Sequence, residues 1–285
     1  GGRRGACCLP KCMLVSNRAA CVEPPVGLCP TRPPKIITAH GFANASASRG
    51  AILMPMKSRR KVLMILTHDR LDCLRLCLEM LEKANAFAAF DHVVLLLNGV
   101  PARLRRYVQQ FMAARPQVRW DTVDGDGTRP GGICAVQNEC IRRYPDSIYV
   151  KVDEDVFVPT GWAERMLATY ERYQDRTDLA LITTLIPNNA YGLHRLLTTF
   201  YPEKLPEFER LFGAPPSAAA KGPTWQRPDI AEWATRLFLD LEAANEEQRR
   251  RLAASDQPRW HEFCQYFSIG CICYDYAHVQ RMGGA

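Results

Sequence analysis

The stretch SIYVKVDEDVFVPTGW, residues 147–162, decides the fold of this chain. Its first part, from Ile148 to Val152, is rich in apolar, β-prone residues and predicts a buried strand. Three acids follow without a break, at Asp153, Glu154 and Asp155. A strand that ends in a run of carboxylates predicts a polar site at that end.

The acidic run has no evident folding purpose, because adjacent carboxylates repel one another and are costly to desolvate. Binding of a divalent cation would explain the run, because Mg²⁺ and Mn²⁺ prefer oxygen ligands. Magnesium sites combine one or two carboxylates with phosphate and water. Side chains alternate along a strand, so we expect Asp153 and Asp155 to point to one side and to share a metal-bound diphosphate, with Glu154 on the other. The alternative is a solvated acidic turn. Lys151 shares the face of Asp153 and can pair with an acid or phosphate, although an ordinary surface lysine is the favoured interpretation.

The sequence before this stretch alternates between apolar runs and helical spacing. We expect strands over 62–66, 92–97 and 118–123, and helices over 71–81, 101–114 and 133–143. After it we expect strands over 179–186 and 267–274, with a helix over 228–245 between them. This order predicts an α/β fold with a mostly parallel central sheet, helices on both faces, and ligands beyond the carboxyl ends of the strands.

Polar side chains close two other predicted strands. Asp69 and Asn98 follow the first and second apolar runs, so they fall at the same edge as Asp153 and Asp155. Such side chains can hydrogen-bond a base and a ribose. Taken singly, Asn98 with Gly99 is typical of a turn, and Asp69 can cap the next helix.

Residues 1–56 differ from the rest of the chain. Of the formal net charge of +7, residues 1–55 hold seven Lys/Arg against one acid, which leaves 30 basic and 29 acidic side chains elsewhere and argues against nucleic acid as a partner. The segment is rich in Cys and Pro, and we interpret it as a disordered or non-native leader with Met56 as a plausible initiator. No apolar run reaches the ~18 residues that cross a bilayer. The seven later cysteines lie in apolar segments, which favours reduced core cysteines and a cytoplasmic location, soluble or peripheral to a membrane.

A series of motifs resembles the central block of nucleotide-sugar glycosyltransferases of the GT-A fold, especially the inverting family 2. These motifs are Gly131-Gly132, then Ala135-Val136-Gln137-Asn138, then the strand that ends in Asp153-Glu154-Asp155. Thr67-His68-Asp69-Arg70 resembles the Thr-x-Asn-Arg signature of the first strand, with Asp69 where asparagine is commoner. Asn98 stands at the second-strand site, which is usually an aspartate. The resemblance covers about residues 61–190 and implies a Rossmann-like GT-A fold.

The resemblance implies a metal-dependent transfer of sugar from a nucleotide-diphosphate donor, a UDP-sugar by default, to a glycan, lipid or protein acceptor. Asp153 would hold the ribose or a metal-bound water, and Asp155 would coordinate Mn²⁺ or Mg²⁺ on the diphosphate. The implied donor-binding residues are Thr67, Asp69, Arg70, Asn98, Asn138 and Asp153. Residues 57–190 would form the donor half, and 191–285 an acceptor region.

The resemblance also implies a catalytic base beyond Ala285, so we expect a C-terminally truncated fold. Inverting transfer needs such a base, and Asp275 and His278 are the weak substitutes within the chain. Two alternatives stay open: a donor-binding fragment or pseudoenzyme that serves as an interaction module, and a nucleotidyltransferase.

Overall fold

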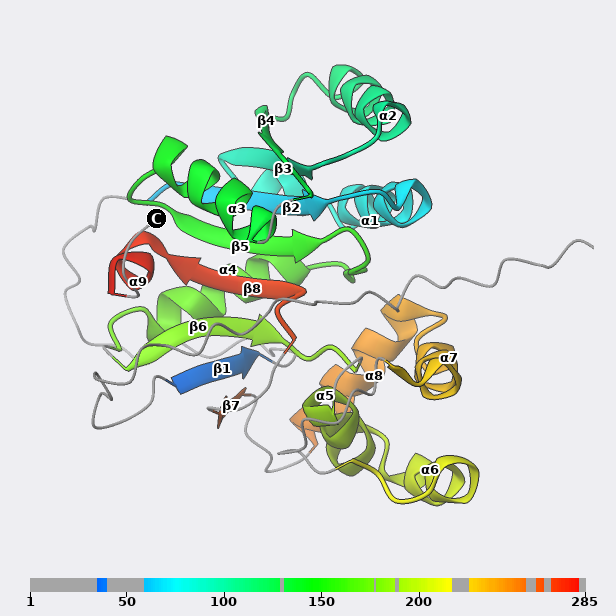
Figure 1. Ribbon diagram of the computed structural model, residues 1–285. Coiled ribbons are helices and arrows are strands. Elements are labelled where there is room, and N and C mark those ends of the chain that lie inside the picture. The colour runs from blue at the N-terminus through cyan, green and yellow to red at the C-terminus, as the bar shows by residue number, and fades with distance from the viewer. Residues whose placement is uncertain are drawn as a thin grey trace, which may run out of the picture.

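The computed structural model describes residues 35–39, 59–128, 131–176, 178–187, 190–216, 226–254, 260–263 and 268–281. Within them the chain forms an eight-stranded sheet in the order β4-β3-β2-β5-β8-β6-β1-β7 (Figure 1). Helices cover both faces, so the predicted α/β fold with a mostly parallel, Rossmann-like sheet is confirmed. In the described parts, no helix combines the length and the apolar character that crossing a bilayer requires.

One half of the sheet is entirely parallel. It contains β2 (Lys61–Thr67), β3 (His92–Asn98), β4 (Trp120–Gly125) and β5 (Ile148–Asp153). The crossover helices are α1 (Leu71–Lys83), α2 (Ala102–Ala113) and α3 (Gly132–Arg143), with the short 3₁₀ helix η2 (Ala86–Ala89) after α1. Each element lies close to its predicted range. Because these strands are parallel, their carboxyl ends meet at one edge.

The other half mixes directions. It contains β6 (Leu179–Thr184), β1 (Lys35–Ala39), β7 (Trp260–Phe263) and β8 (Cys271–Asp275). Strand β8 runs antiparallel to both β5 and β6 and lies between them (Figure 1). Strand β1 pairs in parallel with β6, although residues 35–39 fall in the leader that we expected to be disordered or non-native. These five residues form a strand, and residues 1–34 and 40–58 lie outside the described parts.

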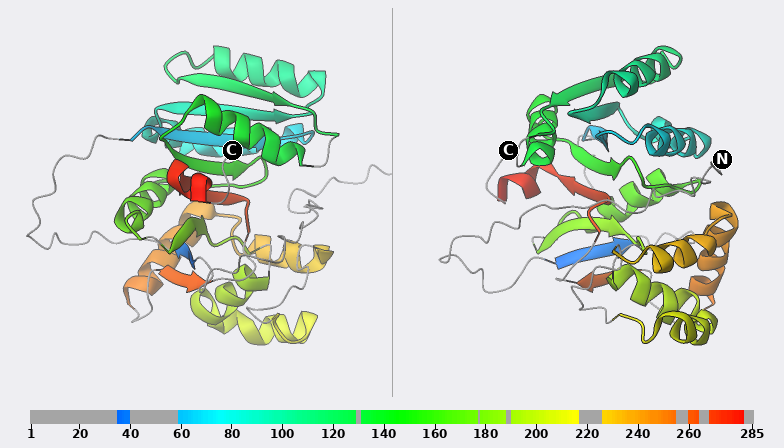
Figure 2. Two further views of the ribbon diagram at one scale, coloured as in Figure 1. Left: turned by 60° about the vertical axis from the view of Figure 1, so that its left-hand side comes forward. Right: turned by 45° about the vertical axis from the view of Figure 1, so that its right-hand side comes forward.

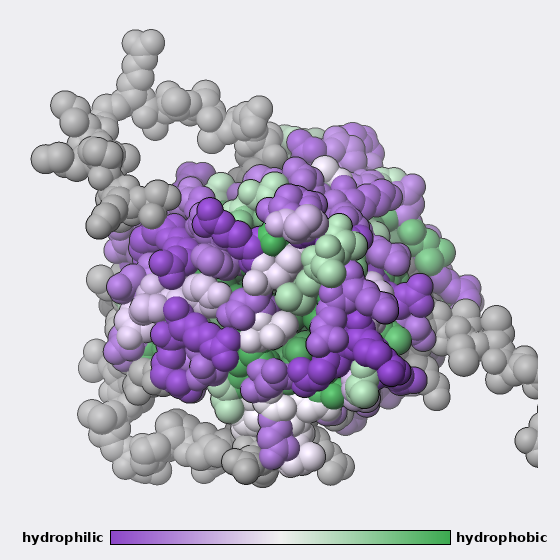
Figure 3. Space-filling view, turned by 90° about the horizontal axis from the view of Figure 1, so that it is seen from above, coloured by the Kyte–Doolittle hydropathy of each residue, from purple (hydrophilic) through white to green (hydrophobic). Residues whose placement is uncertain are grey.

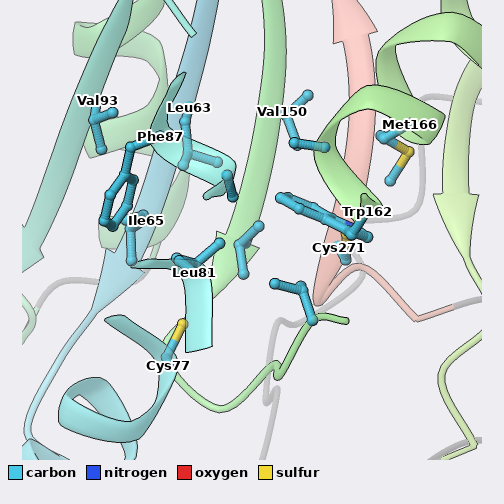
Figure 4. Packing of buried hydrophobic residues seen from close by; sticks show 14 of the residues in the cluster. Leu63, Ile65, Cys77, Leu81, Phe87, Val93, Val150, Trp162, Met166 and Cys271 are labelled. Atoms are coloured by element: carbon cyan, nitrogen blue, oxygen red, sulfur yellow. The ribbon is translucent and has the colours of Figure 1, made fainter. Parts of the chain in front are cut away.

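Two apolar layers sandwich the sheet. On one face, residues of α1, α2 and α4 (Trp162–Tyr173) pack with Leu63, Ile65 and Val150, and Figure 4 shows part of this cluster. No helix was predicted over the residues of α4. On the other face, α3 and α9 (Tyr276–Arg281) pack against Met64 and Tyr149. Figure 1 shows α3 and α4 on opposite sides of the sheet.

Most of the described cysteines belong to these layers. Cys73, Cys77, Cys140, Cys271 and Cys273 are buried free thiols, as predicted. Cys134 differs, because it lies exposed on α3, and Cys264 falls outside the described residues. Seen from above, the molecular surface is mainly hydrophilic, with small interrupted apolar areas (Figure 3).

Residues 190–216 and 226–254 form a helical lobe with a core of its own. Its elements are α5 (Ala190–Arg195), the π-helix η3 (Leu196–Phe200), the 3₁₀ helix η4 (Pro202–Lys204), α6 (Leu205–Phe212), α7 (Pro228–Arg236) and α8 (Leu241–Ala253). The lobe lies beside the β6 side of the sheet (Figure 2). The predicted helix over 228–245 is split, because Asp240 caps a new helix by accepting a hydrogen bond from the Ala243 amide at 3.0 Å. Glu242 of α8 ties the lobe to the segment before α4 by accepting from the Thr160 amide and hydroxyl, both at 2.8 Å.

Candidate functional site

The acids at the end of β5 lie at the carboxyl edge of the parallel half, as predicted. Leu66 pairs with Asp153, so the end of β2 reaches the same level as the acidic run. Asn98 pairs with Gly125 at the ends of β3 and β4. Four neighbouring strands therefore end at this edge, which is where open α/β sheets bind ligands.

Glu154 is the most deeply buried acid of the run, with 2 % of its surface exposed. Its Oε2 accepts hydrogen bonds from the Thr67 hydroxyl and, at 3.1 Å, from the His68 amide. Its Oε1 accepts from Arg70 Nε at 2.9 Å. Both carboxylate oxygens thus accept from residues at or just after the end of β2, so Glu154 joins the end of β5 to the end of β2 and the start of α1.

Arg70 also reaches the next acid, because its Nη1 donates to Asp155 Oδ2 at 2.8 Å. Burial alone would lower the pKa of this guanidinium, but the charges of Asp155 and Glu154 outweigh burial and raise the pKa of Arg70. The predicted alternation is wrong here, since Glu154 and Asp155 contact the same guanidinium. The strand ends at Asp153, and the backbone turns at once, with the Val156 amide donating to the Asp153 carbonyl at 3.1 Å.

Lys151 is buried, with 1 % of its surface exposed, so the favoured interpretation of a surface lysine is wrong. Its ammonium forms an ion pair with Asp153 Oδ1 and donates to the Ile269 carbonyl at 2.9 Å. Burial raises the pKa of the Asp153 carboxyl, and the nearby Lys151 charge opposes that rise. The acidic run thus meets two protein cations: Lys151, for which pairing with an acid was the less favoured alternative, and Arg70.

Asn98 brings an unsatisfied group to the edge. The side chain is 7 % exposed, and its Oδ1 has no hydrogen-bond partner among the described residues. Its backbone carbonyl faces His68 Nδ1 at 2.5 Å, so that nitrogen carries the proton. A buried amide oxygen without a donor is costly and marks a position where a ligand can donate.

A glycine-lined loop closes around Asn98. A Cβ on Gly127 would lie 2.6 Å from the Asn98 carbonyl, and a Cβ on Gly132 would lie 3.0 Å from Asn98 Oδ1. Gly99 has φ of +69°, and a Cβ there would lie 2.6 Å from the Gly127 nitrogen. These contacts require glycine, because only a residue without Cβ lets two backbones approach so closely. The loop leads into α3 at Gly132, so the helix begins beside the unsatisfied amide.

The other predicted donor residues are spread around this edge. Asp69 is exposed, and Arg70, not Asp69, occupies the N-cap position of α1. Asn138 lies half-buried in the second turn of α3. Thr67 is buried, and its hydroxyl donates a hydrogen bond to Glu154. Its hydroxyl would therefore act on a nucleotide-sugar donor only through that carboxylate.

Asp275 and His278 are not brought to this edge. Asp275 pairs with Ile148 at the beginning of β5, while the antiparallel β8 places Cys271 beside Val152 near its end. Asp275 Oδ2 accepts from Arg59 Nη1 at 2.7 Å, and its Oδ1 accepts from the His278 amide at 2.7 Å. These contacts tie the chain before β2 to β8 and α9, which is a structural role.

Replacing Asp275 by asparagine is therefore expected to lower stability by about 2 kcal/mol at pH 7, because charge-assisted hydrogen bonds of a buried carboxylate are lost. Burial raises the pKa of Asp275, but the Arg59 and Tyr170 hydrogen bonds outweigh it, so the folded pKa lies below the ordinary 3.8. The stabilisation is thus present above that value and disappears as the pH falls through the folded pKa. Urea unfolding at pH 7 and pH 3 would show the difference between the variant and wild type shrinking in acid. An unchanged stability at pH 7 would contradict this role.

Two residues of the site escaped prediction in their roles, His68 and Glu154, and the paired role of Lys151 was only the less favoured alternative. Glu154 had a detectable signal, because a hydroxyl at Thr67 and a guanidinium at Arg70 flank the end of the neighbouring strand. Lys151 had one as well, since it stands within an otherwise apolar run in a strand buried on both faces. Lysines are almost never fully buried unless paired, so its position in the run indicated a partner.

The acids can supply only part of the ligands that a divalent cation needs. The contacts within the described residues use Oδ1 of Asp153 and Oδ2 of Asp155, which leaves one oxygen on each carboxylate. Across the described part of the chain, no group of three or more His, Cys, Asp or Glu side chains is arranged to hold a metal. Two carboxylate oxygens fit a Mg²⁺ or Mn²⁺ ion that takes its remaining ligands from phosphate and water.

Comparison with known proteins gives weak similarities. No protein-family model matches the chain, and no curated protein matches it. Among solved structures, the chain is similar to S. aureus TarS 1–349, with 13% identity over 40% of this chain and 33% of that chain, at a TM-score of 0.31. It is also similar to S. aureus TarS, with 12% identity over 40% of this chain and 20% of that chain, at a TM-score of 0.30.

A third similar structure is the mannosyltransferase PcManGT from Pyrobaculum calidifontis in complex with GDP-Man and Mn²⁺. It shares 14% identity over 72% of this chain and 78% of that chain, at a TM-score of 0.36. The chain thus spans one third and one fifth of the length of the two TarS chains. At these TM-scores the similarities identify neither a donor nor an acceptor.

Proposed function

We propose that the protein is a glycosyltransferase of GT-A type that resembles family 2 and takes a nucleotide-diphosphate sugar at the carboxyl edge of β2, β3 and β5. The observation that carries the proposal is the buried Asn98 Oδ1 without a donor, beside the acids of β5. Packing alone gives no reason to keep that amide unsatisfied. A nucleotide that donates to it would remove the cost.

Different residues of the site would bind different parts of the nucleotide-sugar donor. Asn98 and Asp69 would face the base and ribose, and Asp153 and Asp155 would hold Mn²⁺ or Mg²⁺ with the diphosphate. A divalent cation, when bound, offsets the charge on the departing nucleoside diphosphate. In the transfer, the bond between the anomeric carbon and the diphosphate oxygen breaks, and the acceptor hydroxyl oxygen bonds to that carbon. The hydroxyl proton goes to a base, and inversion is part of the proposal.

A second candidate is a donor-binding protein without transfer activity. It is favoured by the position of Asp275 and His278, which lie at the opposite end of β5 from the acids. Calorimetry and product analysis separate the two candidates. Release of UDP or GDP from nucleotide sugars supports the transferase, and metal-dependent nucleotide binding without release supports the binding protein. A cytoplasmic location, from the buried free thiols, also remains a proposal.

The decisive variant is Asn98→Leu. It removes an unsatisfied amide, so we expect the free energy of unfolding to change by less than about 1 kcal/mol, while affinity for UDP or GDP in MnCl₂ falls about 10- to 100-fold. Calorimetry with each nucleotide and urea unfolding would measure the two effects. Asp72→Asn, at an exposed position of α1, is the matched control and should change neither. Wild-type protein that binds neither nucleotide in Mn²⁺ would rule the proposed function out.

A further inference from the structure

One guanidinium spans two neighbouring carboxylates at the site. Arg70 Nε donates to Glu154 Oε1 at 2.9 Å, and Nη1 donates to Asp155 Oδ2 at 2.8 Å. The Arg70 side chain is 24 % exposed, and those of Glu154 and Asp155 are 3 % and 19 % exposed. An ion pair that is partly withdrawn from water is screened less than one on the surface.

Arg70 is anchored in this position from two directions. Its backbone carbonyl accepts from the Leu74 amide at 3.0 Å in the first turn of α1. Glu154, which holds its Nε, is itself fixed by Thr67 and by the His68 amide. The guanidinium therefore stays beside Asp155 without help from a ligand.

The charges explain what this arrangement does to a cation. Asp153, Glu154 and Asp155 carry three negative charges, and Lys151 and Arg70 supply two positive ones. A divalent ion on Asp155 alone would meet the Arg70 charge at close range, and like charges in a weakly screened site repel strongly. A nucleoside diphosphate brings enough negative charge to compensate the guanidinium and the ion together.

We propose that Arg70 is an internal counter-ion that prevents Asp155 from holding a divalent cation until a nucleoside diphosphate is present, so that cation and nucleotide bind cooperatively. This regulation rests on the proposed function, since it concerns the same donor site. The resemblance implied that Arg70 is a donor-binding residue; in the nucleotide-free protein its guanidinium instead pairs with the carboxylates of Glu154 and Asp155. The charges of Lys151 and Arg70 then offset most of the negative charge of the three acids in the nucleotide-free protein. The carboxylates remain in place to bind the ion when the nucleotide arrives.

The experiment titrates MnCl₂ into the protein and follows free Mn²⁺ by electron paramagnetic resonance, with and without UDP or GDP. Nucleotide alone is titrated in parallel to account for its own Mn²⁺ complex. For wild type we expect Mn²⁺ affinity to rise at least about 10-fold with nucleotide. For Arg70→Gln we expect nucleotide-free Mn²⁺ affinity to rise at least about 10-fold and the coupling to shrink, because the competing charge is gone. Arg70→Lys, which keeps the charge but cannot span both carboxylates, should be intermediate.

Arg103→Gln is the matched control, because it removes the same charge from an exposed position on α2 and should leave every affinity unchanged. Circular dichroism checks that each variant is folded. An Arg70→Gln protein that binds Mn²⁺ no better than wild type overturns the inference, and so does a wild type whose Mn²⁺ affinity ignores nucleotide. If Arg70→Gln does not fold, wild type and Arg70→Lys decide, and equal coupling in the two overturns it. If nucleotide and Mn²⁺ bind independently of each other, only this inference is overturned. If neither of them binds, the proposed function is overturned as well.

Discussion

Replacing Glu154 by alanine is expected to lower the free energy of unfolding by about 3–5 kcal/mol, the largest effect of any single change at the site. The buried carboxylate accepts from three donors, and its loss leaves the Thr67 hydroxyl, the His68 amide and the Arg70 guanidinium without that acceptor. Arg70 keeps Asp155 as a partner at 2.8 Å, so the cost comes from the donors that lose their acceptor, at about 1–3 kcal/mol for each one left unsatisfied. Urea denaturation at pH 7 measures the change.

Glu164→Ala is the control, because Glu164 is an exposed acid in the first turn of α4. It should shift stability by less than about 0.5 kcal/mol. Glu154→Gln should fall between the two, since an amide keeps one acceptor oxygen but turns an NH₂ group toward donors. A Glu154→Ala protein within about 1 kcal/mol of wild type would show that the network does not hold the edge together.

Gly99→Ala is expected to destabilise the protein by about 3 kcal/mol and to abolish detectable nucleotide binding. Two costs add: alanine at φ of +69° is strained by about 1 kcal/mol, and its Cβ would lie 2.6 Å from the nitrogen and 2.7 Å from the Cα of Gly127. Both neighbours are backbone atoms, so the loop must move away from Asn98. Thermal unfolding and calorimetry with UDP and GDP measure the two outcomes.

Gly131→Ala separates strain from collision. Gly131 has a similar φ of +78°, but a Cβ there would have nothing within 4 Å. It should therefore cost only about 1 kcal/mol and leave more nucleotide affinity than Gly99→Ala. Equal losses in the two variants would mean that the close approach of Gly99 to Gly127 is unimportant.

The parallel half of the fold could be predicted because its signals are local. Short apolar runs such as 62–66 and 93–97 favour buried strands, and the spacing of Leu71, Leu74, Leu78 and Leu81 predicts the intervening helix. The position of β8 could not be predicted, because a strand pattern identifies no partner and no direction. Helix α4 was missed although Ala163, Met166, Leu167 and Tyr170 follow helical spacing.

The sequence predicted where the candidate site lies, but it did not predict which residues contact one another there. The edge that joins Asn98 to the acids follows from topology, because parallel strands end together. The partners of the acids do not, since alternation applies only while the chain is extended, and β5 ends at Asp153. Which cation neutralises which carboxylate depends on the turn that follows and on the rotamers of Arg70 and Lys151, and neither can be read from spacing.

Strand β8 joins two groups of strands that are otherwise separate, β4-β3-β2-β5 on one side and β6-β1-β7 on the other. During synthesis, β5 and β6 leave the ribosome well before residues 271–275, so each exposes an open backbone edge until the strand that fills the gap arrives. Open edges recruit wrong partners, and pairings between distant segments form slowly. A nascent chain that ends before Cys271 therefore lacks the strand that pairs β5 with β6, and both of these edges are open to wrong pairing.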